Sequence, residues 1–157
     1  MKKLSIKDLL IINAGMTELT KVDGPFNPQT GQYEQKPRAL GVGMGLACAR
    51  AMAAIDPILT DYSEQRAKLV EMYTDGSKVD ERGNRPFRND KSREKFAKEE
   101  KELHERTVPV ALPDFTTKDF EHPWVTADML FKLRRIITDF NAPAETADGP
   151  KKDEQAA

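Results

Sequence analysis

Apolar residues recur at helical spacing over one long stretch of the chain, from Leu40 to Tyr73. Steps of three and four residues place side chains on one face of a helix. The members of this stripe are Met44, Cys48, Ala51, Ile55, Ile58, Tyr62, Leu69 and Met72. We therefore expect a long central helix. Its narrow stripe needs a partner surface, from the same chain or from a second copy.

A proline interrupts the central helical pattern at Asp56-Pro57. Proline removes one backbone hydrogen bond and either kinks a helix or ends it. In the second case Asp56 would cap a new helix with Pro57 at its first position. Because the apolar stripe keeps its phase across the proline, we expect one kinked, continuous helix, although residue types alone leave a break open.

A shorter helix is predicted near the amino terminus. Ser5 can cap it, with Asp8 three residues later in place of the usual Glu or Gln. The run Val22-Asp23-Gly24-Pro25 then ends it. Residues 23–37 are dense in turn formers, so a hairpin and a flexible surface loop are equally compatible with them.

The second half of the chain predicts a charged helix and an edge strand. After a polar connection, Asn89 or Asp90 can cap a helix that runs to about Arg106. Its apolar content is thin, which is typical of a surface helix stabilised by charge pairs. In residues 107–115 apolar side chains alternate with other residues, and prolines stand at 109 and 113. This pattern suits a short edge strand.

The fold class that follows is mainly α, in a single helical domain over residues 1–140. Thr126 opens a last helix that is expected to reach Phe140. The fold then has about four helices, with a long kinked central helix and one or two short strands or hairpins. Residues 141–157 are rich in Ala, Pro, Asp, Glu and Lys, and we expect a disordered tail. The thin surface helix and the short last helix can hardly cover the long central helix completely, so we expect a homo-oligomer.

Composition and charge narrow the class of protein. The 157 residues are 38% apolar and 32% charged, which suits a helical protein with much solvated surface. A formal net charge of −1 gives no electrostatic reason to bind nucleic acid or acidic membranes. No uninterrupted apolar run approaches the roughly 18 residues needed to span a bilayer. The single Cys48 and the lack of a targeting segment predict a cytosolic protein.

No motif in the chain predicts catalysis, a cofactor or a metal. Gly41, Gly43 and Gly45 do not have the spacing of a dinucleotide loop. We expect the small residues of this segment to allow close approach of another helix: Gly45, Ala47, Ala49, Ala51, Ala53 and Ala54. The two histidines, at positions 104 and 122, are isolated in the sequence, which does not favour a metal site. Cys48 lies on the apolar stripe, so we expect a buried thiol and not a catalytic one. We therefore favour a protein that is not an enzyme.

Two groups of residues are candidates for ligand binding. On the central helix an arginine lies between two tyrosines at steps of four and seven, an arrangement that can recognise a planar or phosphorylated ligand or tie the helix to its neighbour. Residues 78–95 carry seven basic and four acidic residues and can grip phosphate or an acidic protein face, unless they form a solvated loop. The candidate residues are Tyr62, Arg66, Tyr73, Arg82, Arg85 and Arg88.

The motif Asp61-Tyr62-x-x-x-Arg66-x-x-Leu69-x-x-x-Tyr73, together with the order of elements over residues 3–140, resembles small proteins encoded by tailed bacteriophages. Most members of that group have no assigned function, so the resemblance implies a phage accessory role in the host cytoplasm. The chain departs from their pattern in its glycines at 41, 43 and 45 and in residues 23–37.

The function expected from this resemblance is binding to a host component. An anti-defence protein that masks a host immune protein, or that sequesters a nucleotide immune signal, suits the size of the chain and its lack of catalytic motifs. A phage morphogenesis factor is the alternative, in which the long helix serves subunit packing. A small nucleotide-cleaving enzyme is a third possibility, because acids and histidines from distant segments can converge in a fold.

Overall fold

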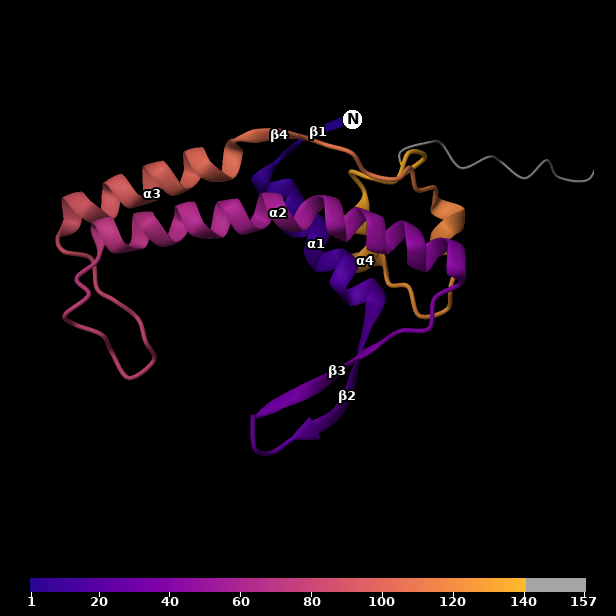
Figure 1. Ribbon diagram of the computed structural model, residues 1–157, viewed down its shortest axis with the longest axis horizontal. Helices are drawn as coiled ribbons and strands as arrows, with labels where there is room; N and C mark the ends of the chain where they lie inside the picture. Colours follow the sequence, from indigo (N-terminus) through magenta and orange to yellow (C-terminus); the bar gives the residue numbers. More distant parts are fainter. Residues whose placement is uncertain (141–157) are drawn as a thin grey trace, which may run out of the picture.

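The computed structural model of the protein describes residues 1–140, and the predicted disordered tail lies outside this range (Figure 1). Its helices are α1 (Ile6–Thr20), α2 (Val42–Tyr73), α3 (Asp90–Glu105), the 3₁₀ helix η1 (Thr117–Phe120) and α4 (Ala127–Leu133). Its strands are β1 (Lys2–Ser5), β2 (Lys21–Asn27), β3 (Gln32–Pro37) and β4 (Thr107–Val110). Helices dominate, as predicted, but two small antiparallel sheets accompany them.

Helix α1 is the centre of the core. It begins at the predicted cap, where the Ser5 hydroxyl accepts a hydrogen bond from the backbone N–H of Asp8 at 3.1 Å and the Asp8 carboxylate bonds back to Ser5. Its fully buried apolar residues, at positions 6, 9, 12, 16 and 19, pack with the first half of α2 and with α4. One face of a 15-residue helix thus supplies much of the core.

Helix α2 runs for 32 residues without a break at Pro57, so the prediction of a continuous helix is confirmed. Only four of its residues are buried: Cys48, Ala51, Ile55 and Tyr62. They lie on the predicted stripe, at steps of three, four and seven. Most of the helix surface therefore faces away from the rest of the chain.

The first half of α2 carries an exposed apolar face. Val42 is 89% exposed and Leu46 is 50% exposed. By length and composition alone, α2 is the one helix of residues 1–140 that could cross a membrane, with a mean hydropathy of 1.4 over 18 residues of which 17% are buried. Arg50 and Asp56 interrupt this half, which is why the sequence shows no unbroken apolar run.

The two sheets differ in their surroundings. Strand β1 pairs with β4, and Leu4 and Val110 from these strands are buried in the core. Strands β2 and β3 form an exposed hairpin, so of the two alternatives for residues 23–37 the structure has the hairpin. At its end Phe26 and Tyr33 pack edge to face, with ring centroids 5.3 Å apart.

Helix α3 packs along the second half of α2, and the two extend away from the rest of the molecule (Figure 1). We call this part the arm; it consists of α2 from Tyr62 to Tyr73, the tip loop (residues 74–89) and α3. Of the two residues predicted to cap α3, Asn89 is the cap, and its side chain accepts a hydrogen bond from the N–H of Ser92 at 2.8 Å. The body comprises α1, α4, η1, the β1–β4 sheet and the first half of α2.

The last helix is shorter than predicted. Helix α4 begins after Thr126, whose side chain accepts from the N–H of Met129, but it ends at Leu133 and not at Phe140. Thr138 donates from both its N–H and its hydroxyl to the carbonyl of Phe115, at 2.8 and 3.0 Å. These long-range bonds replace helical ones, and helical periodicity cannot indicate them.

Of the small residues of α2 that were expected to allow close approach of another helix, Ala51 is fully buried in the core, but Gly45 has no such neighbour. A Cβ added to Gly41 or Gly43 would meet nothing within 4 Å, and one added to Gly45 would meet only Leu40 at 3.9 Å. A glycine that does allow a close helix contact lies in α1. A Cβ at Gly15 would lie 2.9 Å from the Lys132 Cβ of α4 and 3.0 Å from Leu133.

We predict that Gly15→Ala lowers the free energy of unfolding by about 1–3 kcal/mol, because α1 and α4 must separate. Gly43→Ala is the matched control. It adds the same methyl group in open space and should raise stability by up to about 1 kcal/mol through helix propensity. Urea unfolding of both variants measures the difference, and equal stability of the two would contradict the close contact.

Candidate functional site

The three candidate ligand residues of α2 all point at α3. The hydroxyl of Tyr62 is hydrogen bonded to Nε2 of His104 at 2.7 Å, and the two rings are stacked. One turn further, Nε of Arg66 donates to a carboxylate oxygen of Glu100 at 2.8 Å. The hydroxyl of Tyr73 donates to Glu99 at 2.5 Å. Each candidate therefore already has a partner inside the arm.

These contacts correspond to the second alternative for the motif, in which it ties one helix to its neighbour. Burial raises the pKa of the Tyr62 hydroxyl, and the hydrogen bond to Glu99 raises the pKa of Tyr73. Both phenols are consequently protonated at neutral pH and act as hydrogen-bonding groups of the helix contact. Arg66 and Glu100 are partly exposed, so their ion pair adds little to stability.

The three candidate arginines of the tip loop have different surroundings. Arg88 is engaged at the end of α2, where its Nε donates to the carbonyl of Thr74 at 3.1 Å and its terminal nitrogen to that of Glu71 at 3.4 Å. Arg82 and Arg85 are exposed. With residues 1–140 their side chains form no ion pair. Only two of the six candidates thus remain free for a ligand.

The tip loop has its own network of hydrogen bonds. The carboxylate of Asp80 accepts from the N–H of Arg82 at 2.9 Å and from the N–H of Asn84 at 2.7 Å. Gly83, with φ of +80°, supplies the left-handed turn between them. The side-chain bond from Asn84 is the main reason that the pKa of Asp80 is lowered. A defined turn therefore presents Arg82.

A small cleft lies beside this turn. It has a volume of about 440 Å³. Its lining residues are Lys78, Val79, Asp80, Asn84, Arg85 and Pro86. Asp80 was not among the candidates, although aspartate three residues before a glycine is a common turn signal.

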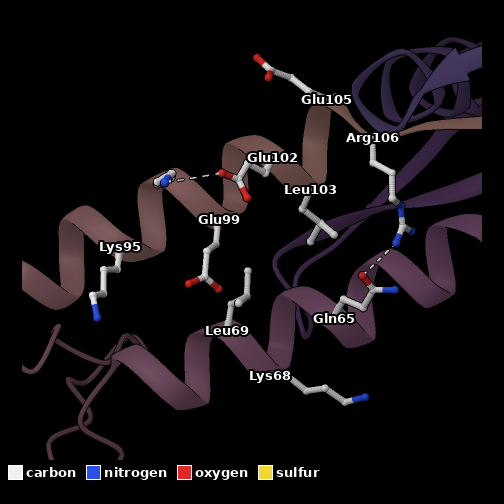
Figure 2. Close-up of a pocket in the computed structure, with 10 residues that line it drawn as sticks. Gln65, Lys68, Leu69, Lys95, Glu99, Glu102, Leu103, Glu105 and Arg106 are labelled. Atoms are coloured by element: carbon white, nitrogen blue, oxygen red, sulfur yellow. Dashed lines mark hydrogen bonds and ion pairs between the residues drawn. The ribbon is translucent and has the colours of Figure 1, made fainter.

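A larger groove runs along one side of the arm between α2 and α3 (Figure 2). Its volume is about 1050 Å³. Leu69 and Leu103, each half-buried, supply its apolar part. Its charged residues are Lys68, Lys95, Lys98, Glu99, Glu102, Glu105 and Arg106. The sequence analysis missed this groove because a groove between two helices requires their relative placement.

The remaining residues that could bind a metal or act in catalysis have other surroundings. In the described part of the chain, no three His, Cys, Asp or Glu residues gather in a way that could hold a metal ion. His122 stacks on Trp124 with ring centroids 5.1 Å apart, and the guanidinium of Arg38 lies 4.1 Å from the Trp124 ring centre. Cys48 is buried, and burial raises the pKa of its thiol to about 11.

The first prediction for these residues concerns the tie between the helices. Tyr62→Phe should lower the free energy of unfolding by about 1 kcal/mol, because the partly buried ring nitrogen of His104 loses its partner. Tyr33→Phe, in the exposed hairpin, removes the same hydroxyl and should change stability by less than about 0.5 kcal/mol. Chemical denaturation of both variants measures this. A Tyr62→Phe protein of unchanged stability would favour the ligand-binding alternative.

The second concerns the thiol. At neutral pH, Cys48 should react with iodoacetamide at least about tenfold more slowly in the folded protein than in denaturant, because the thiolate is the reactive form. Mass spectrometry of alkylated protein over time gives both rates. Equal rates would mean an accessible, activated thiol and would reopen the question of catalysis.

Comparisons with known proteins give no family. No family model matches the chain, and searches of curated proteins and of solved structures found no match either. The resemblance to small proteins of tailed phages therefore stays a prediction that depends on the motif in α2 and on the order of the elements.

Proposed function

We propose that the protein is a non-enzymatic accessory protein of the tailed-phage type that acts by binding. In this proposal it masks an acidic surface of a host immune protein, with the tip of the arm as the contact. The observation that carries the proposal is the turn around Asp80, which presents Arg82 and Arg85 without ion-pair partners in residues 1–140.

The chemistry of the tip supports an anionic protein partner. Guanidinium groups bind carboxylates through two parallel hydrogen bonds and are weakly hydrated, which suits them to interfaces. A loop with a defined shape loses little conformational entropy when it binds. The tip also lies far from the body of the molecule, so a large partner can reach it (Figure 1).

The nucleotide-sequestering version has weaker support. Small-ligand sites are concave and bury most of the ligand surface. The tyrosines and the arginine that could hold a base or a phosphate are bonded to α3. The groove and the cleft of the arm lie open at its surface, and charged residues make up most of the lining of the groove and half of that of the cleft.

A second candidate function, phage assembly, is favoured by the exposed face of α2. Val42 and Leu46 project from the first half of this helix beside small residues, and contiguous apolar surface of this kind commonly marks a protein–protein contact. A morphogenesis factor would use the face to pack against other phage subunits.

The test is affinity purification of the tagged protein from phage-infected host cells. Arg82→Ala/Arg85→Ala should reduce capture of a host defence protein by about tenfold or more, because two charge-assisted contacts are lost. Lys3→Ala/Lys7→Ala, in the body, removes the same charge and is the matched control. Both variants change exposed side chains, so circular dichroism should show unchanged helix content.

Each other outcome identifies a competing function. If wild type and both variants capture capsid or tail proteins, the protein acts in phage assembly and does not mask a host protein. A thermal shift with cyclic or linear nucleotides that Arg66→Ala abolishes would replace it by nucleotide sequestration. Loss of a nucleotide during incubation would indicate an enzyme.

A further inference from the structure

The groove of the arm has a volume of about 1050 Å³ and a rim of charged side chains. Four side chains on α3 form a stripe along it, at steps of three, four and three residues: Lys95, Lys98, Glu102 and Glu105. The first two are basic and the last two acidic. Beneath them the floor contains the half-buried Leu69 and Leu103 (Figure 2).

The charge order along α3 is the reverse of what favours an isolated helix. Residues 90–98 contain four basic residues and two acidic ones, whereas residues 99–105 contain four acidic residues and one basic residue. The helix dipole favours acidic residues at the amino end and basic ones at the carboxyl end. Stability of the helix itself therefore does not account for this arrangement.

The charged side chains of the rim form only long, exposed ion pairs within the arm. Lys98 and Glu102 approach each other only to 4.0 Å, and their side chains are 79% and 65% exposed. Lys101 and Glu105 lie 3.8 Å apart with similar exposure. Such exposed pairs one turn apart contribute little, so these groups can bind a partner at small cost.

We propose that the groove is covered by the arm of a second copy of this chain, packed antiparallel. With position 100 of one α3 opposite position 100 of the other, Lys95 meets Glu105 of the second copy and Lys98 meets Glu102 of the second copy. The two-fold axis repeats both contacts, which gives four ion pairs between the copies. The aliphatic stems of the lysines lie over the two leucines of each groove.

The charge pattern selects this occupant over others. A partner of one sign would meet repulsion along half of the rim, and a parallel copy would place like charges opposite each other. Only a chain with the opposite order of charges matches the whole stripe, and an antiparallel copy of α3 has that order. The four proposed ion pairs use side chains of α3 and neither Arg82 nor Arg85, so this inference does not depend on the proposed function.

Sedimentation velocity on a dilution series tests the dimer. Wild type should be a dimer at low ionic strength, and it should dissociate at about 1 M salt, where the Debye length falls to about 3 Å. Lys95→Glu/Lys98→Glu and Glu102→Lys/Glu105→Lys should each associate about a hundredfold more weakly, because four attractive pairs become repulsive.

The two variants control each other. In an equimolar mixture every contact is again between opposite charges, so a heterodimer should form from two proteins that are monomeric alone. Circular dichroism should show equal helix content in all samples. Wild type that stays monomeric at every concentration, variants that dimerise as strongly as wild type, or a mixture that stays monomeric would each overturn the proposal.

Discussion

The structure depends on a mismatch of length between α1 and α2. Helix α2 has 32 residues and spans about 48 Å, whereas the 15 residues of α1 span only about 22 Å. Helix α1 also crosses α2 and does not lie along it (Figure 1), so the core formed by α1 and α4 leaves the far end of α2 uncovered. The second half needs another partner, and α3 provides it. This is why the molecule has an arm.

The arm has a polar contact between its helices because α3 has few apolar residues to offer. Phe96 is its only buried side chain, and Tyr62, Arg66 and Tyr73 of α2 are hydrogen bonded to α3. Arg106, directly after α3, also donates to Gln65 and Asp61 of α2 at 3.0 Å. A hydrogen bond of this kind contributes about 1 kcal/mol, far less than burying a large apolar side chain. The arm is thus held in place by a few contacts along one side of each helix, and its other surfaces are open to partners.

Local signals of the sequence predicted much of this fold. The caps at Ser5, Asn89 and Thr126 are set by side chains within three residues of the bonds they make. The stripe of α2 likewise keeps its phase through Pro57. The features that the sequence did not predict depend on distant contacts. They are the hydrogen bonds from Thr138 that end the last helix early, and the close contact of Gly15 in α1 with α4. Spacing along one helix could not decide whether Arg66 faces a ligand or another helix, because either partner needs the same positions.

Two surfaces of the arm remain once these internal contacts are counted, and they have different physical characters. The tip presents Arg82 and Arg85, which have no ion-pair partner among residues 1–140, on a turn fixed by Asp80, and this suits an acidic partner of another kind. The groove presents both signs in a fixed order, which suits a copy of itself. In the antiparallel arrangement each tip extends toward the body of the other copy. A partner bound at the tip could then contact both subunits. Each arm, which has few contacts between its own helices, would be stabilised by packing against the other.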